Sequence, residues 1–391
     1  MKKKTIKIIL PVMALWLLAV SHPLLGQQAI IVNHNCTNIH RIPSYWLAQI
    51  RANLRIGYGH TSHGSQPVTG MFAFRGEAGS AYYFSYSGYG LEPGKVLNDY
   101  WGNAGGAEDL GGYGDLGWRD ATVTMLEDPQ NDRNVVAWSW CGGVSDNTWG
   151  GIHTYLTAMN QLELDYPGVK FVYMTGHLDG TGESENLHLR NQQIRSYCKN
   201  NKKTLFDFAD IESFDPDGGT NYMKLLADDN CDYDSDGDGY EDSNWAVDWI
   251  AAHPGHELTK LAKPAICDDC AHSQRLNCVL KGRAFWWMLA RLAGWNGSGW
   301  LTVTAPASGA SWTRGSTHAI TWTKGGVQAA NVKIRLYRNG TFVKMIASST
   351  ANDGSFSWNV QSDLAAGSGY VVRITASDNQ VEGDSKSFAI Q

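Results

Sequence analysis

Charged residues are scarce in this sequence. Asp, Glu, Lys and Arg make up only 18% of its 391 residues. The apolar share is 43%, which is too high for an intrinsically disordered chain. The 43 glycines do not recur at every third position, which excludes a collagen-like fibre. A chain of this length is expected to form two domains, or three.

Long apolar runs are also missing, except at the N-terminus. Basic residues of the first seven positions precede the run Ile8–Val20, and Ser21, His22 and Pro23 follow it. A membrane helix needs about 20 apolar residues, so we favour a signal peptide over a membrane anchor. We expect residues 1–26 to be this signal and the mature protein to be secreted, either to the cell surface, the periplasm or the medium. No transmembrane segment is expected in the mature chain.

A positive charge excess is absent. Removing the four leader lysines from the 32 basic residues leaves 28, against 38 acidic residues, or about -10. Such a chain has no general attraction to phosphate backbones or anionic lipids. The composition therefore predicts no nucleic-acid partner.

Cysteine is absent from the last 113 residues. The seven cysteines lie between Cys36 and Cys278, and Cys267 and Cys270 stand close to the last of them. A four-cysteine zinc site usually has two Cys-x-x-Cys pairs, and only one is present. We therefore favour a disulfide here over a zinc corner, with the pairing left open. The odd count leaves at least one thiol unpaired within the chain.

The composition changes at residues 295–299. Beyond this break, short alternating runs separated by turn residues predict a small β-sandwich over residues 298–391. The segments "ITWTKGG", "VKIRLYRNG" and "LAAGSGYVVRITASDN" resemble the immunoglobulin-like module of the yeast cell-wall-synthesis protein type. The resemblance implies an accessory module of secreted enzymes. Trp312, Trp322 and Trp358 are candidates for either a sugar-binding platform or the sandwich core.

Residues 27–297 alternate between strand and helix patterns. The expected buried strands are residues 55–58, 135–140, 169–174 and 204–208. The expected helices between them are residues 154–164 and 187–199. This alternation predicts an α/β domain with an open, mostly parallel sheet. In such sheets the functional site lies beyond the carboxyl ends of the strands.

Polar residues beside glycine follow three of these strands. The first strand leads into His60, Ser62 and His63, the next into Gly143 and Asn147. The third cluster contains His177. A serine at a tight turn can act as a nucleophile, and glycine and asparagine N–H groups can hold an oxyanion. Each cluster alone is equally compatible with a glycine-rich turn and its capping hydroxyls.

A further pair of chemically active residues precedes the last predicted helix. Asp269 stands three residues before His272, a spacing at which a carboxylate can orient an imidazole. The alternative is a surface loop in which the two residues occur by chance.

An early serine and a late Asp-x-x-His block resemble the SGNH (GDSL-type) hydrolase superfamily, which implies a three-layer, flavodoxin-like fold. By this resemblance Ser62 is the nucleophile, His272 the base and Asp269 its orienting carboxylate. It also implies an oxyanion hole at Gly105 or its neighbour and at Asn147, with Gly143 as a further candidate. His60, His63 and His177 are then expected to line the substrate pocket.

The sequence departs from the superfamily pattern in two blocks. The usual Gly-Asp-Ser reads Gly-His-Thr-Ser, and the usual Gly-x-Asn-Asp block reads Cys-Gly-Gly-Val-Ser-Asp-Asn. The α/β-hydrolase elbow fits less well, because its first glycine is missing and Ser62 comes too early in the chain. Ser65 is a weaker nucleophile candidate. Cys141 is another, although a cysteine beside Trp140 is more often buried and inert.

An acidic segment interrupts the second half of the domain. The carboxylates of this segment are spaced as in the first nine positions of an EF-hand-type calcium loop, but the final glutamate of that loop is missing. The segment resembles the shorter calcium loops of thrombospondin type-3 and dockerin repeats. We expect a structural calcium ion, and the alternative is a solvated acidic loop. The expected ligands are Asp234, Asp236, Asp238, Tyr240 and Asp242.

Together these features predict a secreted serine esterase that removes acyl groups, most simply acetyl, from a polysaccharide or another ester. Catalysis is expected to need no cofactor. Abundant tryptophan favours a sugar substrate because aromatic faces stack on sugar rings. The alternative is a non-catalytic, calcium-stabilised carbohydrate-binding or adhesion protein on a degenerate SGNH fold.

Overall fold

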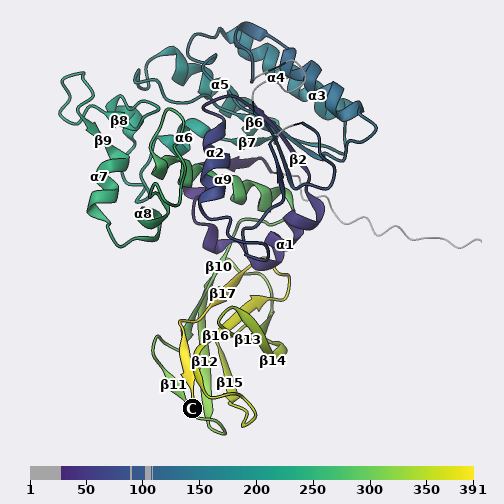
Figure 1. Cartoon of the computed structure of the whole chain (residues 1–391), viewed down its shortest axis with the longest axis vertical. Coiled ribbons are helices and arrows are strands. Elements are labelled where there is room, and N and C mark those ends of the chain that lie inside the picture. Colours follow the sequence, from purple (N-terminus) through teal and green to yellow (C-terminus); the bar gives the residue numbers. More distant parts are fainter. Residues whose placement is uncertain (1–27, 89, 102–106, 108) are drawn as a thin grey trace, which may run out of the picture.

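A computed structural model describes residues 28–88, 90–101, 107 and 109–391. The expected signal peptide and Gly105 therefore lie outside the described residues. The described chain forms an α/β domain followed by a β-sandwich (Figure 1). These two parts have separate hydrophobic cores, the first reaching Trp295 and the second starting at Leu301.

Seven strands of the described residues form one sheet in the order β1-β7-β6-β5-β2-β4-β3, and every pairing is parallel. The strands are β1 Ile30–Val32, β2 Ile56–His60, β3 Tyr86–Ser87, β4 Leu97–Trp101, β5 Val135–Trp138, β6 Lys170–Met174 and β7 Thr204–Phe206. All residues of β2 and β5 are buried, as expected for parallel strands covered on both faces. The predicted mostly parallel α/β sheet is confirmed.

Helices cover both faces of the sheet. Helices α1, α2 and α9 pack together, and α3, α4 and α5 lie across the sheet from them (Figure 1). The helices are α1 Ser44–Asn53, α2 Ser65–Ala73, α3 Gly117–Glu127, α4 Trp149–Asp165, α5 Asn186–Asn200, α6 Phe208–Glu212, α7 Trp245–Ala252, α8 Glu257–Leu261 and α9 Arg275–Leu292. Short 3-10 helices occupy His34–Cys36, Ile39–Arg41, Gly112–Gly114 and Tyr222–Leu225.

The strand order creates a switch point between β2 and β5. The five strands β4-β2-β5-β6-β7 follow the flavodoxin-like order 2-1-3-4-5. The chain continues from β2 toward β4 on one side and from β5 toward β6 on the other. Ligands bind beyond the carboxyl ends of the two strands at this point. Ser62 and His63 follow β2, and Cys141 follows β5, so they meet where such a site is expected.

Two glycines bring α2 and α9 into close contact. A Cβ on Gly70 would lie 1.7 Å from the Cys278 carbonyl oxygen, and a Cβ on Gly282 would lie 2.3 Å from the Gly70 carbonyl carbon. Helix α2 begins just after His63, and α9 begins just after His272. The close helix packing therefore brings the two histidine loops together.

The sandwich has two facing sheets. Its strands are β10 Trp300–Ala305, β11 Ser311–Trp312, β12 Thr317–Gly325, β13 Asn331–Arg338, β14 Thr341–Ala351, β15 Ser355–Asn359, β16 Gly367–Ala376, β17 Glu382–Asp384 and β18 Phe388–Ile390. One sheet has the order β10-β12-β15 and the other β11-β18-β16-β13-β14, with β17 paired to β16. Trp312, Trp322 and Trp358 are buried, which assigns all three to the core rather than to a sugar platform.

The two domains touch through tryptophan side chains of the α/β domain. Trp46 Nε1 donates to the Asn379 carbonyl oxygen at 2.9 Å, and Trp295 Nε1 donates to the Gln380 carbonyl oxygen at 2.7 Å. Part of the tryptophan excess therefore serves this junction. In the described part of the chain, no helix is both long and apolar enough to cross a bilayer.

Candidate active site

The carboxyl ends of β2, β5 and β6 carry the polar loops that were expected there. His63 follows β2, Cys141 follows β5 and His177 follows β6. Two segments from later in the chain join them, one with Asp229 and one with His272. Five side chains that are distant in sequence therefore gather above the switch point.

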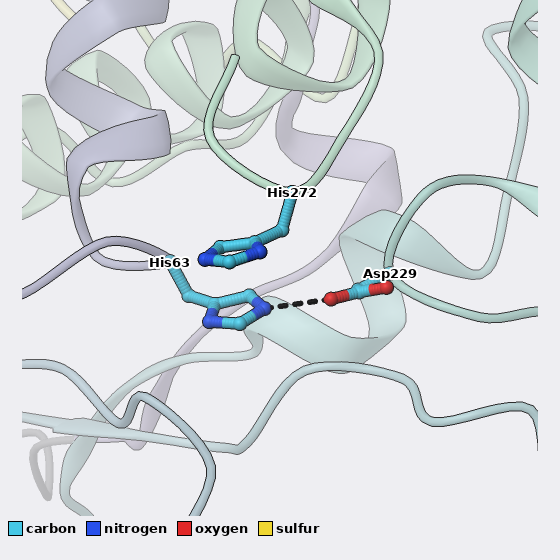
Figure 2. Close-up of side chains that lie close together, drawn as sticks. All are labelled: His63, Asp229 and His272. Carbon is cyan, nitrogen blue, oxygen red and sulfur yellow. Dashed lines mark hydrogen bonds and ion pairs between the residues drawn. The ribbon is translucent and has the colours of Figure 1, made fainter.

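A continuous hydrogen-bonded chain joins a thiol, an imidazole and a carboxylate. Cys141 Sγ lies 3.2 Å from His63 Nδ1, and His63 Nε2 lies 2.7 Å from Asp229 Oδ2. Figure 2 shows the second of these contacts, with the carboxylate directed at the imidazole edge. This arrangement of nucleophile, base and orienting acid is the one that activates a catalytic thiol.

The electrostatics of this chain favour an ion pair. The His63 imidazole, with help from hydroxyl groups of Ser62 and Thr61, lowers the pKa of the Cys141 thiol to about 5, although burial raises it. Burial lowers the pKa of His63, but its hydrogen bonds to Asp229 and Cys141 outweigh this and raise the pKa to about 9. At neutral pH the pair is therefore a thiolate and an imidazolium.

Two further imidazoles flank His63. The His177 ring stacks on it with centroids 3.8 Å apart and planes 2° from parallel. The His272 ring stacks at 4.3 Å and 11°, above His63 in Figure 2. His272 adopts φ of 58°, an uncommon conformation for a residue with a side chain, and such residues cluster at functional sites.

The ligand atoms of His63, Asp229 and His272 lie within 4.8 Å of one another, which is close enough for three ligands of one metal ion. A metal shared by two imidazoles lies close to the plane of each ring. The stacked rings of His63 and His272 are nearly parallel and have no such common direction. Both nitrogens of His63 also face partners within the site. The geometry therefore fits a nucleophilic site better than a metal centre.

Ser62 lies beside the thiol. Its Oγ is 3.1 Å from Cys141 Sγ, and its carbonyl oxygen accepts from the Ser65 hydroxyl at 2.7 Å. Among the hydrogen bonds of the described residues, none joins the Ser62 hydroxyl to a histidine. Ser62 is thus well placed to donate to the thiolate, whereas its proton has no adjacent imidazole acceptor.

The expected Asp269–His272 pair does not form. The Asp269 side chain is 93% exposed and pairs with Arg275 instead. Asp269 precedes the disulfide between Cys270 and Cys278, and His272 lies within the loop that this disulfide closes. A three-residue spacing brings two side chains together only if the backbone between them turns suitably, and here the carboxylate turns outward. The carboxylate that does contact an imidazole is Asp229, whose Oδ2 lies 2.7 Å from His63 Nε2.

Two other expected site residues are buried in structural roles. Asn147 is 2% exposed, its Nδ2 donates to the Gly143 carbonyl oxygen at 2.7 Å, and its Oδ1 accepts from the Thr148 N–H at 2.9 Å. Its amide therefore holds the loop rather than an oxyanion. His60 is fully buried and pairs with Asp99, so it does not line the substrate pocket.

The loop after Cys141 contains two glycines, and there is open space beside the first. Gly142 and Gly143 both adopt positive φ, at 73° and 71°, which residues with side chains rarely do. A Cβ added at Gly142 would meet open space, so the backbone is accessible on this side of the thiol. Gly143 remains our candidate oxyanion donor through its backbone N–H.

Sequence reasoning gives little weight to two residues of the hydrogen-bonded chain. Cys141 is only a weaker nucleophile candidate by sequence, although its place three residues after β5 and before two glycines is the signal of an active-site loop. Asp229 follows no strand of the parallel sheet and belongs to no motif that we recognised. A tertiary contact across 166 positions brings it to His63, and nothing in the local sequence encodes that contact.

The acidic segment forms a hairpin loop between β8 Asp232–Tyr233 and β9 Ser243–Asn244. Carboxylate oxygens of Asp234, Asp236 and Asp238 converge within 4.8 Å of one another, a donor set suited to calcium. Tyr240 has an exposed ring, and its N–H donates to Asp238. Asp242 accepts from Ser235 instead, so its side chain is engaged away from the three converging carboxylates.

Comparison with known proteins identifies the second domain. The family of the Kre9/KNH-like N-terminal Ig-like domain matches residues 305–390. These residues are a Kre9/KNH-like Ig-like domain. The match confirms the predicted module and leaves the α/β domain without a family assignment. No curated protein matches the chain.

Solved structures show similarity at a low level. The fibronectin(III)-like modules of Clostridium thermocellum CbhA are 19% identical, with 23% of this chain and 93% of that chain covered and a TM-score of 0.17. A CARDB domain from Pyrococcus furiosus is 15% identical, at 24% and 88% coverage and a TM-score of 0.16. An endo-beta-1,4-mannanase double mutant from Cellulomonas fimi is 12% identical, at 72% and 52% coverage and a TM-score of 0.19. We base no functional argument on these likenesses.

Proposed function

We propose that this protein is a secreted carboxylic ester hydrolase that uses Cys141 as its nucleophile. The observation that carries the proposal is the Cys141–His63–Asp229 chain at the switch point of the sheet. The substrate we propose is an acylated polysaccharide, with acetyl as the simplest acyl group.

The reaction proceeds in two steps. The Cys141 thiolate attacks the ester carbonyl carbon, and the tetrahedral intermediate expels the alcohol, which takes the proton from His63 Nδ1. The acyl group is then held as a thioester. Neutral His63 next removes a proton from water, and the resulting hydroxide attacks the thioester carbonyl. The carboxylic acid leaves, and Cys141 returns as a thiolate beside protonated His63.

Each neighbouring group has a defined task in this scheme. Asp229 accepts from the His63 Nε2–H and so keeps Nδ1 directed at the sulfur. Ser62 donates to the thiolate, which keeps the sulfur in place before attack. The backbone N–H of Gly143 is proposed to bind the oxyanion of the tetrahedral intermediate.

Ser62 is the competing nucleophile, in line with the SGNH resemblance. The observation in its favour is its position directly after the first strand of the flavodoxin-like core. Its Oγ faces a thiol of low pKa, and a thiolate stabilised in this way is a poor base for a hydroxyl proton. We therefore assign Ser62 a supporting role. The residue that carries the acyl group in the covalent intermediate distinguishes the two candidates.

A sugar substrate is supported by two exposed aromatic side chains, one on the connection that begins with Cys141 and one bonded to it. Tyr113 is 70% exposed and donates to Asp146 at 2.8 Å, and Trp149 is 60% exposed at the start of α4. Asp146 and Trp149 belong to the same connection that begins with Cys141. Exposed aromatic faces of this kind stack on sugar rings. Stacking removes their apolar surface from water, which stabilises the complex.

We also propose export and a structural calcium ion. The N-terminal leader, the Cys270–Cys278 disulfide and the Ig-like domain are consistent with an oxidising, extracellular location. Asp234, Asp236 and Asp238 would hold the calcium ion at the tip of the hairpin loop. Calcium there neutralises converging carboxylates and plays no part in the proposed chemistry.

The proposed function is tested with a chromogenic acetyl ester and the purified mature protein. We expect turnover by the wild-type protein, no turnover by Cys141→Ala, and reduced turnover by Ser62→Ala. Wild-type protein without esterase activity on aryl or sugar acetates would favour the non-catalytic binding protein. Full activity of Cys141→Ala with an inactive Ser62→Ala would instead support the serine mechanism.

A further inference from the structure

A fully buried charged pair lies beneath the proposed site. Lys281 is in the middle of α9 and Glu212 ends α6, and both have 0% exposure. Lys281 Nζ donates to Glu212 Oε1 at 2.7 Å. The proposed chemistry uses neither residue. Burial of both charges is costly, so their presence among apolar neighbours needs a reason.

The pair connects the loops that carry the three histidines. Lys281 Nζ also donates to Gln66 Oε1, and Gln66 Nε2 donates to the Ala271 carbonyl oxygen at 2.6 Å. Glu212 Oε2 accepts from the Leu178 N–H at 2.8 Å. Leu178 follows His177, Ala271 precedes His272, and Gln66 lies three residues after His63. One ammonium group is thus linked, through Gln66 or Glu212, to the chain segments that carry the three imidazoles.

The same network extends to the segment that carries Asp229. Asn277 Nδ2 donates to Glu212 Oε1 at 3.1 Å and to Ser273 Oγ at 2.8 Å. Gln274, the residue after Ser273 in the chain, donates from Nε2 to Asn230 Oδ1 at 2.9 Å, and Asn230 is next to Asp229. The network therefore supports the orienting carboxylate as well as the histidines.

Stability alone does not account for this network. Well-packed apolar residues in place of a buried ion pair are often neutral or stabilising, whereas a hydrogen-bonded polar network favours one geometry. Among the described residues of this network, Asn277 Oδ1 is buried without a hydrogen-bond partner. The helical members of this network bond to loop residues of the site, which are Leu178, Ala271 and Ser273. The buried network is therefore arranged to fix the positions of the loops that carry the three histidines.

We propose that Lys281, paired with Glu212, is a positioning residue that holds the His63, His177 and His272 loops in register and so sets the reactivity of Cys141. This inference rests on the proposed function, because it concerns the same thiol. It adds a residue that does not touch the substrate.

The test compares two double variants of the full mature chain. Lys281→Met/Glu212→Gln removes the buried pair without leaving a lone charge. Arg283→Met/Glu257→Gln is the matched control, because it removes an ion pair of 2.6 Å from the same helix that connects to α8 instead. The readout is the pH dependence of Cys141 alkylation by iodoacetamide, followed by peptide mapping.

We expect the alkylation midpoint of Lys281→Met/Glu212→Gln to rise by about one pH unit, which at pH 5 slows alkylation about fivefold. The control variant should keep the wild-type midpoint. A folded Lys281→Met/Glu212→Gln protein with the wild-type midpoint would overturn the inference while the proposed function stands. A wild-type thiol that ionises only near pH 8.5 would overturn both.

A second variant covers the case in which the double variant does not fold. Gln66→Met is close in size and leaves the Lys281–Glu212 pair in place, but it cuts the link to Ala271. We expect a smaller rise of the alkylation midpoint in this variant. An unchanged midpoint in folded Gln66→Met would then contradict the inference.

Discussion

His63 Nδ1 lies 3.2 Å from Cys141 Sγ, although 78 positions separate the two residues in the sequence. The contact follows from the sheet, because β2 and β5 are neighbours and both residues directly follow these strands. Parallel strands end at the same edge, so the loops that follow them meet. This contact is the basis of the chemistry that we propose.

Removing the thiol should abolish catalysis without affecting the fold. We expect Cys141→Ala to reduce kcat/KM on an acetyl ester by at least about 10³-fold, because covalent catalysis is lost. Cys231→Ala is the matched control, since Cys231 is also unpaired but fully buried and its pKa is raised by burial. Equal losses in both variants would point to misfolding rather than to a lost nucleophile.

Two aspartates distinguish the observed site from the one expected from sequence. Asp229→Asn should lower kcat by about 10²- to 10⁴-fold, because the amide no longer fixes the His63 tautomer or stabilises its cation. Asp269→Asn should change kcat little, since Asp269 is exposed and pairs with Arg275. Steady-state kinetics on one ester measure both. A large loss in Asp269→Asn alone would restore the Asp269–His272 assignment.

The ion pair predicts a broad pH range of activity. The Cys141 pKa lowered to about 5 means that the thiolate is lost as the pH falls through that value. The His63 pKa raised to about 9 means that the imidazolium is lost as the pH rises through that value. We therefore expect kcat/KM to be level between these limits and to fall outside them. A single ionisation near pH 7 would instead indicate a neutral histidine acting on a hydroxyl nucleophile.

The exposed Trp149 at the start of α4 offers a test of the sugar substrate. One stacking contact of about 0.5–1.5 kcal/mol corresponds to a change of about 2- to 12-fold. We expect Trp149→Ala to raise KM on an acetylated polysaccharide by this factor and to leave KM on a small aryl acetate unchanged. Trp300→Ala is the control, because Trp300 is also exposed but lies in the sandwich. Equal KM changes on both substrates would argue against a sugar subsite.

Calcium should stabilise the α/β domain through the hairpin loop. An ion present at ten times its Kd adds about 1.4 kcal/mol to the free energy of unfolding, so Tm should rise with added calcium. Asp234→Asn should remove this rise, because Asp234 is one of the three converging carboxylates. Asp248→Asn, an exposed change just outside the loop, should keep it. A Tm that is insensitive to calcium in wild-type protein would mean that the loop is only a solvated acidic turn.

The sequence predicted the architecture better than the site. Buried runs such as 135–140 and 169–174 identify parallel strands because such strands are apolar on both faces. The same reasoning placed polar clusters at the carboxyl ends of these strands. Edge strands β1 and β3 have three and two residues, too few for a clear pattern, and they were not anticipated.

Side-chain pairing in the site was beyond local pattern reading. The Asp269–His272 spacing looked like a pair, but the backbone turns the carboxylate to Arg275. Asp229 reaches His63 only because the segment after η4, the 3-10 helix Tyr222–Leu225, folds back over the sheet. Such contacts depend on how distant loops pack, and packing of loops is not encoded in residue periodicity.

The most direct test of the account is the identity of the acylated residue. Wild-type protein is mixed with an activated acetyl ester, quenched in acid within the first turnover and mapped by peptide mass spectrometry, with Cys141→Ala and Ser62→Ala treated in parallel. We predict an acetyl thioester on the Cys141 peptide that is present in the wild-type protein and absent in Cys141→Ala. An acetyl ester on the Ser62 peptide that persists in Cys141→Ala would contradict the account.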